Sequence, residues 1–179
     1  MHVYWFDVEV AGPVTDDDFE RLGDVLTARD GIDATPQADH RGGRIMFARE
    51  AEDAVQAVTS AVRDVEASGI RVTGVVEDRV TVSEIAEKAR VTDAAVRYWI
   101  AGLRGPGGFP EPVVRRERLS LFSWAEVAAW LTWNKLGEAD PTAAETAQAC
   151  KIIDAALTVR NGLRELPRHA RPLVRELVA

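Results

Sequence analysis

The side chains best suited to chemistry lie in residues 80–101, and the chemistry is recognition of a macromolecule rather than catalysis. Apolar residues at helical spacing predict one buried face of a short helix. Its outward face carries Thr92, Asp93, Ala94, Arg97, Tyr98 and Ala101. The forked guanidinium of Arg97 suits the edge of guanine in the DNA major groove, and a solvated surface arginine is the alternative. Tyr98 could contact the DNA backbone or pack on a neighbouring hairpin.

Two short helices joined by a tight turn are expected to hold this face. Thr81 and Glu84 form a capping box, so the first helix begins near residue 82. Ile85 and Ala89 face inward, and the small Ala86 lets a second helix cross closely. This spacing is typical of a helix-turn-helix, in which the outward positions of the second helix face the major groove.

The second helix is capped by Thr92 and is expected to bury Val96, Trp99 and Ile100. Two residues depart from the usual pattern. Arg90 stands at a turn position often held by glycine, and Asp93 would repel phosphate.

Residues 102–131 predict a basic hairpin, or wing, followed by another helix. A Gly-Pro-Gly-Gly turn precedes two expected strands, 113–116 and 119–122. Ser123 and Glu126 form a second capping box. Four arginines are candidates for contact with phosphate or the minor groove: Arg104 before the wing, and Arg115, Arg116 and Arg118 on it. The alternative is a solvated basic hairpin.

These motifs together resemble the excisionase and AlpA-like winged helix-turn-helix proteins, relatives of the MerR DNA-binding domain. About 50 of the 179 residues are covered. The matching positions are Ala86, Val91, Val96, Trp99, Ile100, Gly102, Phe109, Pro110, Pro112, Phe122, Trp124, Val127, Trp130 and Leu131. The chain is also similar to actinobacterial proteins with a small acidic α/β domain ahead of this winged domain. The resemblance implies double-stranded DNA binding, with Arg97 in the major groove and the wing on the flanking backbone.

Residues 1–78 predict a small α/β unit with the element order βαββαβ, the ferredoxin-like arrangement. Strands are expected at 4–10, 32–36, 44–48 and 70–76, with a turn at 41–43. Apolar stripes predict helices from Thr15 to about Leu26 and over 51–65. The fold class is therefore α+β, and the fold by itself implies no function.

Charge divides the chain into three parts. Residues 1–78 carry 7 basic and 17 acidic side chains, 79–133 carry 8 and 6, and 134–179 carry 7 and 6. Because the acidic excess lies wholly in the first part, the net charge of −7 does not argue against DNA binding by the second. We expect domains at 1–78 (assembly or sensing), 79–133 (DNA binding) and 134–179.

The last part is expected to be a helical tail. A helix is expected to open at Pro141 and to run to about Arg160. Gly162 and Pro167 are expected to interrupt the helical pattern. A last short helix carries Leu173 and its neighbours. Its apolar stripe could dock on its own chain or pair with a second copy. We favour some dimer contact, because dimers of winged modules read two half-sites.

Several function classes find no support in the sequence. No catalytic motif is present, so an enzyme is not expected, and neither a cofactor nor a metal site is predicted. The acidic run at residues 16–18 suits a helix start better than a metal site. The single Cys150 excludes an internal disulfide and is expected to be buried. No membrane span or signal peptide is recognised, so a cytoplasmic location is expected.

The leading hypothesis is a sequence-specific regulator of transcription that binds duplex DNA as a homodimer. The alternative is an antitoxin or anti-repressor-type module, in which the acidic N-terminal domain binds a protein partner or occludes the DNA-binding face. A third hypothesis, compatible with the first, is an ACT-like domain that binds a small molecule and regulates DNA binding by the second domain.

Overall fold

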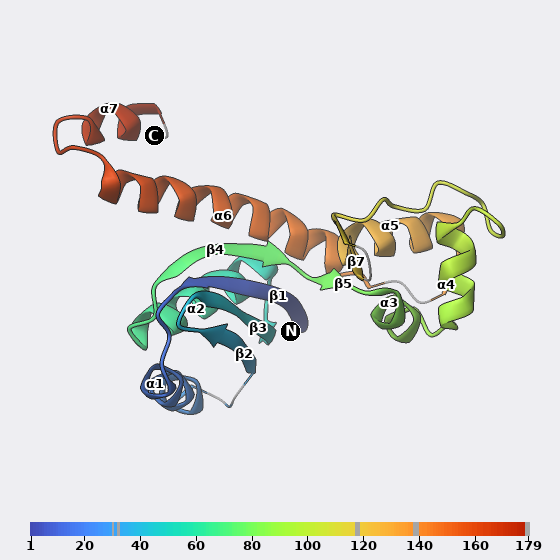
Figure 1. The fold of residues 1–179 in the computed structure, drawn as a ribbon, viewed down its shortest axis with the longest axis horizontal. Helices are drawn as coiled ribbons and strands as arrows, with labels where there is room; N and C mark the ends of the chain where they lie inside the picture. Colours follow the sequence, from blue (N-terminus) through green and yellow to red (C-terminus); the bar gives the residue numbers. More distant parts are fainter. Residues whose placement is uncertain (30, 32, 117–118, 138–139, 178–179) are drawn as a thin grey trace.

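The computed structural model describes residues 1–29, 31, 33–116, 119–137 and 140–177 of the chain. It is an α+β structure with antiparallel sheets (Figure 1). The elements are β1 (His2–Ala11), α1 (Asp16–Thr27), β2 (Ala34–Asp39), β3 (Gly42–Ala51), α2 (Ala54–Ala67), β4 (Val72–Glu77), β5 (Arg79–Val80), α3 (Val82–Lys88), α4 (Asp93–Ile100), β6 (Val114–Arg116), β7 (Leu119–Ser123), α5 (Trp124–Asn134), α6 (Ala143–Glu165) and α7 (Arg171–Leu177).

A four-stranded antiparallel sheet in the order β2-β3-β1-β4 forms the first half of the molecule. Side chains alternate across a strand, so Tyr4, Phe6 and Val8 of β1 share one face, and all three are buried. Phe6 lies opposite Phe47 of β3, and their rings stack at 5.6 Å. This face forms one hydrophobic core with α1 and α2.

Helix α6 lies against β4, one of the two edge strands of this sheet (Figure 1). The backbone N–H of Val75 in β4 donates to Asp154 Oδ1 at 3.0 Å, and Asn161 Nδ2 donates to the carbonyl of Val72 at 3.2 Å. These two polar side chains satisfy backbone groups that an edge strand would otherwise leave open to another chain. Part of the stripe expected on the tail therefore docks on its own chain, with Ala149, Cys150 and Leu157 buried in the core of the sheet.

A second, smaller core lies under residues 80–143 and is rich in aromatic side chains. Phe109 contacts Trp99, Phe122 and Trp130 with ring centroids 6.4, 5.7 and 5.0 Å away. Trp130 Nε1 donates to the carbonyl of Gly107 at 2.9 Å and so ties the glycine-rich turn to α5. Packing thus explains Trp99, Phe109, Phe122 and Trp130, whereas Trp133 is 87% exposed.

The structure corrects several expected boundaries in the first half. The second strand lies at 34–39 rather than 32–36, and residue 32 is outside the described residues. The turn is His40-Arg41, because Gly42 (φ 96°) already belongs to β3, where an added Cβ would meet the Val10 carbonyl oxygen at 2.5 Å. Helix α2 begins at 54 rather than 51, since Asp53 caps it by accepting from the Gln56 N–H.

Three expectations in the second half are also wrong. Gly162 does not interrupt α6, which continues to Glu165, because a single helical glycine costs only about 1 kcal/mol. Ile100 is 40% exposed, since the last turn of α4 projects beyond the core. Strand β5 was not expected at all; it pairs Arg79 with Ser123 and Val80 with Phe122.

No helix within the described residues is long and apolar enough to cross a membrane.

Candidate nucleic-acid interface

Local hydrogen bonds begin α3 and α4 where the sequence predicts. The Thr81 N–H donates to Glu84 Oε2 at 2.6 Å, and the Glu84 N–H donates to Thr81 Oγ1 at 3.3 Å, which completes the capping box. Thr92 Oγ1 accepts from the Ala95 N–H at 3.2 Å and caps α4. Both caps satisfy N–H groups that a helix start leaves without an intrahelical partner.

The turn between the two helices is held by the core and by a left-handed residue. Arg90 has φ 53°, so the turn position often taken by glycine does adopt the conformation that favours glycine. Ile85, Ala89 and Val96 are fully buried around it. The fold therefore accommodates the unusual residue at Arg90 at a backbone cost of about 1–2 kcal/mol.

Asp93 has a structural partner that the sequence did not indicate. Ser83 Oγ of α3 donates to Asp93 Oδ2 at 2.8 Å, so this carboxylate links the starts of the two helices. A residue that seemed unfavourable for DNA contact thus helps to hold α4 against α3.

The outward face of α4 is exposed at the expected positions: Thr92, Asp93, Ala94, Arg97, Tyr98 and Ala101. Arg97 has no hydrogen bond or ion pair with any described residue. Its guanidinium is therefore available to a ligand.

Arg104 and Tyr98 are brought together. Helix α4 ends at Ile100, and Gly102 beyond it adopts φ 65°. The Arg104 guanidinium then lies 5.1 Å from the centre of the Tyr98 ring. This cation–π contact holds a positive charge beside Arg97 on the same helix end. Tyr98 is 41% exposed and remains accessible.

The structure describes the side chain of one of the three arginine candidates in residues 113–122, Arg115. Arg115 Nη2 donates to Glu111 Oε2 at 3.0 Å, in an ion pair whose side chains are 71% and 87% exposed. Such exposed pairs are weak, so Glu111 would release Arg115 to a phosphate at little cost. Arg116 belongs to strand β6, and Arg118 lies outside the described residues.

A lysine missed by the sequence reasoning connects the two cores. Lys88 Nζ of α3 lies 4.9 Å from the Trp5 ring centre, 5.3 Å from that of Trp124 and 2.9 Å from Asp78 Oδ2. These partners lie far apart in the chain, so no local pattern could have identified the contact. It ties α3 to β1 of the sheet.

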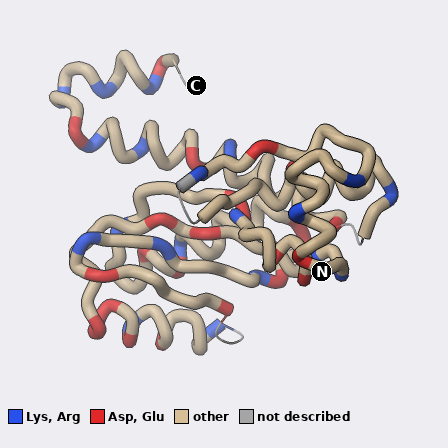
Figure 2. The backbone as a smooth tube through the Cα atoms, turned by 45° about the vertical axis from the view of Figure 1, so that its right-hand side comes forward, with Lys and Arg blue, Asp and Glu red and all other residues tan. Residues whose placement is uncertain are grey.

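The charges are distributed unequally over the molecule. Acidic side chains run along α1, on the opposite side of the molecule from α7 (Figure 2). Helix α4 lies at one end of the molecule, and α1 with the four-stranded sheet lies at the other (Figure 1). Among the described residues, no three His, Cys, Asp or Glu side chains lie close enough to hold a metal ion.

Comparisons of the chain with protein-family models, with curated protein sequences and with solved structures gave no match.

Proposed function

We propose that this protein is a sequence-specific duplex-DNA-binding protein, a regulator of transcription that acts as a homodimer. The observation that carries the proposal is the outward face of α4, where exposed Arg97 has no partner among the described residues. A guanidinium in this position can donate two hydrogen bonds to O6 and N7 of guanine.

The arrangement of the helices supports this function. A capped α3, a tight turn and a capped α4 over a shared core are the parts of a helix-turn-helix. The β5-β7-β6 sheet beside them supports a winged version of the motif. Helix α4 would enter the major groove, with Thr92, Ala94, Arg97 and Tyr98 toward the bases and nearby phosphates.

The flanking arginines would provide contacts that do not depend on sequence. Arg104 beside Tyr98, together with Arg115, Arg116 and Arg118 of the 113–122 wing, would neutralise phosphates or enter the minor groove. The excisionase and AlpA-like resemblance supports the same docking. We further propose that residues 1–78 are a ferredoxin-like domain, which the strand order β2-β3-β1-β4 supports.

Apolar side chains left exposed on the tail support the homodimer. Ile152 of α6 is 57% exposed, and Leu173 and Leu177 of α7 are 65% and 85% exposed. A second copy that covered them would place two winged units on one DNA duplex, as a palindromic site requires.

The test is fluorescence anisotropy with labelled genomic fragments, including the DNA upstream of the protein's own gene, at two salt concentrations. We expect one fragment to be preferred and affinity to fall as salt rises, with a slope that counts the phosphate contacts. Equal affinity for all fragments would contradict sequence specificity, and no binding at low salt would contradict the function.

One observation favours a second function, that of an antitoxin or anti-repressor-type interaction module. Asp16, Asp17, Glu20 and Asp24 of α1 are exposed and have no ion pair among the described residues. They could bind a basic protein. An affinity for a basic partner that is lost when these four side chains are neutralised, together with no DNA binding, would favour this alternative.

A further inference from the structure

Lys88 lies where two parts of the molecule meet. One is the four-stranded sheet unit (β1–β4 with α1 and α2), and the other is the α3–α4 unit (α3, α4 and the core that they share with α5). Lys88 Nζ is 4.9 Å from the ring centre of Trp5 in β1 and 5.3 Å from that of Trp124 in α5. Both distances are within the roughly 6 Å over which a cation is attracted to an aromatic face. One charge therefore contacts an indole ring from each unit.

Asp78, which joins β4 to β5, supplies the counter-charge at this contact. Its Oδ2 lies 2.9 Å from Lys88 Nζ, and the side chains of Asp78 and Lys88 are 23% and 25% exposed. Asp78 Oδ2 is buried and accepts no hydrogen bond from a described residue, so the nearby ammonium compensates its charge. Loss of Lys88 would leave a buried carboxylate oxygen without a partner, which is unfavourable.

Trp124 is fixed within its own unit. Its backbone N–H donates to the Asp78 carbonyl at 3.0 Å, and its Nε1 donates to Asp140 Oδ2 at 2.8 Å. Its side chain is buried, whereas Trp5 is 48% exposed. Trp5 is therefore the contact that β1 contributes, and it rests on a lysine and a tryptophan that are held in place by other bonds.

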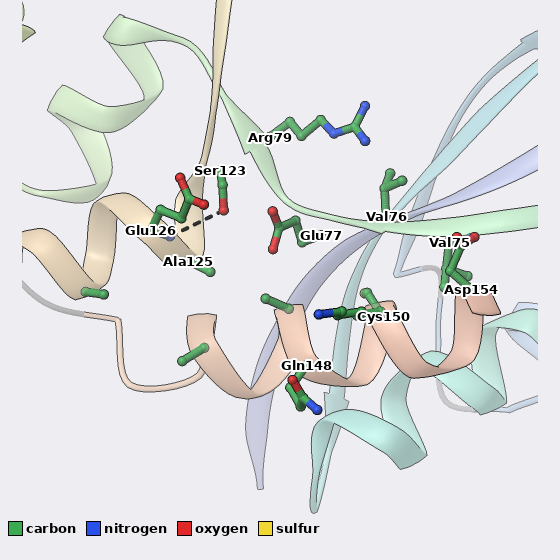
Figure 3. Close-up of a pocket in the computed structure, with 14 residues that line it drawn as sticks. Val75, Val76, Glu77, Arg79, Ser123, Ala125, Glu126, Gln148, Cys150 and Asp154 are labelled. Atoms are coloured by element: carbon green, nitrogen blue, oxygen red, sulfur yellow. Dashed lines mark hydrogen bonds between the residues drawn. The ribbon is translucent and has the colours of Figure 1, made fainter. Parts of the chain in front are cut away.

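Packing beside β4 is incomplete. An open depression of about 530 Å³ lies between β4, α5 and α6 (Figure 3). Four short side chains line it from the two helices: Ala125, Ala129, Ala144 and Ala147. Because atoms across a gap make no contact, this side of the junction resists rotation of the units only weakly.

Helix α6 also joins the two units, but it does so next to α5. Ala143 at the start of α6 lies in the second core, and Ala149 lies in the core of the sheet. The helix packs on α5 and β4. The orientation of α3 and α4 therefore depends on the contact of Lys88 with Trp5.

We propose that Lys88 is a positioning residue, a latch that fixes the angle of α3 and α4 relative to the four-stranded sheet unit. Its ammonium holds Trp5 against Trp124, and Asp78 holds the ammonium. Without the latch, each unit stays folded, and the units change their relative angle about the chain at Asp78. In the proposed homodimer on DNA, a fixed angle would set the distance between the two α4 helices, and this consequence alone rests on the proposed function.

The experiment is double electron–electron resonance on the protein without DNA, so that a failure of DNA binding leaves its result unaffected. Nitroxide labels are attached at Val55→Cys in α2 and Ala94→Cys in α4, because both residues are exposed and belong to different units. Burial raises the pKa of Cys150 to about 12, so its thiol is not labelled. Labelled chains are diluted into an excess of unlabelled chains, which removes distances between copies. We expect one narrow distribution of distances when Lys88 is present.

Variants of the two residues test the latch directly. Lys88→Met keeps an unbranched side chain but removes the charge, and it should broaden the distribution or shift its maximum beyond the width seen with Lys88. Trp5→Leu should have the same effect, and the double variant should add nothing further, because both changes break one contact. Lys88→Arg keeps a cation that stacks on aromatic rings and should restore the narrow distribution. Lys151→Met removes the same charge from an exposed position of α6 and should leave the distance unchanged.

Far-UV circular dichroism of each variant shows whether it is folded. A folded Lys88→Met with an unchanged distribution would overturn the proposal, and so would equal broadening by Lys151→Met. A distribution that is already broad with Lys88 present would also overturn it, because nothing would then be fixed. If Lys88→Met does not fold, Trp5→Leu decides the question, since its half-exposed ring can be removed without opening a core. An unchanged distance in Trp5→Leu would then contradict the latch.

Discussion

One arginine of the four-stranded sheet unit and one arginine of the α3–α4 unit have opposite surroundings. In the sheet unit, Arg49 is 5% exposed and is held by Asp33 and Asp64, with Nε and Nη1 each 2.6 Å from a carboxylate oxygen. In the α3–α4 unit, Arg97 is exposed and has no partner among the described residues. One arginine completes the fold, and the other is left for a ligand.

This difference explains why the acidic total says little about DNA binding. Many acidic groups of the sheet unit are already paired, such as Asp7 with Arg44 at 3.0 Å and Glu66 with Arg160 at 2.5 Å. Arg97 belongs to α4, which lies at one end of the molecule, whereas the four-stranded sheet lies at the other (Figure 1). The charge of each region and its ion pairs therefore say more about DNA binding than the net charge of the whole chain does.

The largest effect is expected from Arg49→Ala. It leaves the carboxylate of Asp33 without its guanidinium partner and that of Asp64 with Arg29 alone, although burial itself opposes the charge on Arg49. Removing one partner of a buried pair costs about 3–5 kcal/mol in the free energy of unfolding. Urea denaturation checks this, with Arg97→Ala as the control that should change stability by less than about 0.5 kcal/mol. Equal losses in the free energy of unfolding for Arg49→Ala and Arg97→Ala would contradict the difference between these two arginines.

A somewhat smaller effect is expected from pH at Asp7. Burial, opposed by Arg44 and reinforced by Asp78, raises the pKa of Asp7 from 3.8 to about 6. The folded state then binds the proton more tightly than the unfolded state, so the contribution of Asp7 to stability is fully present below about pH 4 and is lost as the pH rises to about 6. The total change is up to ~3 kcal/mol.

Urea midpoints of the wild type and Asp7→Asn, measured from pH 4 to pH 7, test this sign. The wild type should lose stability relative to the variant as the pH rises through this window. Parallel profiles would mean that Asp7 titrates as an exposed carboxyl.

The smallest effect is expected at the turn between α3 and α4. Arg90→Gly should be more stable than Arg90→Ala by about 1 kcal/mol, because both lose the side chain but only glycine adopts φ 53° freely. At Glu87, inside α3, the order should be reversed, so that Glu87→Gly is less stable than Glu87→Ala. Thermal melting of the four variants measures both differences, and a matching sign at the two positions would show that the turn is unstrained.

Local patterns predicted most of the elements. The caps at Thr15, Thr81 and Thr92 are where the sequence placed them, because capping depends on residues three apart. Strand β5 could not be predicted, since its two residues pair with Ser123 and Phe122, more than forty positions away. The start of α2 was predicted at residue 51, where the apolar stripe begins, but the cap at Asp53 places it at Ala54.

The candidate site was predictable in its exposure but not in its contacts. Helical spacing placed Thr92, Ala94, Arg97 and Tyr98 on one outward face, and all four are exposed. The Ser83–Asp93 bond, the contact of Arg104 with Tyr98 and the position of Lys88 between two tryptophans all depend on tertiary packing. Periodicity carries no information about such pairs.

The central claim is that Arg97, unlike the buried and paired Arg49 of the sheet unit, serves to read DNA. The direct measurement compares the wild type, Arg97→Ala and Arg63→Ala by fluorescence anisotropy on the preferred fragment and on single-base variants of it. Arg63 is a matched control because it is also exposed and has no ion pair among the described residues. Arg97→Ala should cost about 1–3 kcal/mol and lose discrimination at one base pair, while Arg63→Ala should bind like the wild type. Equal affinity and specificity of all three proteins would contradict the claim.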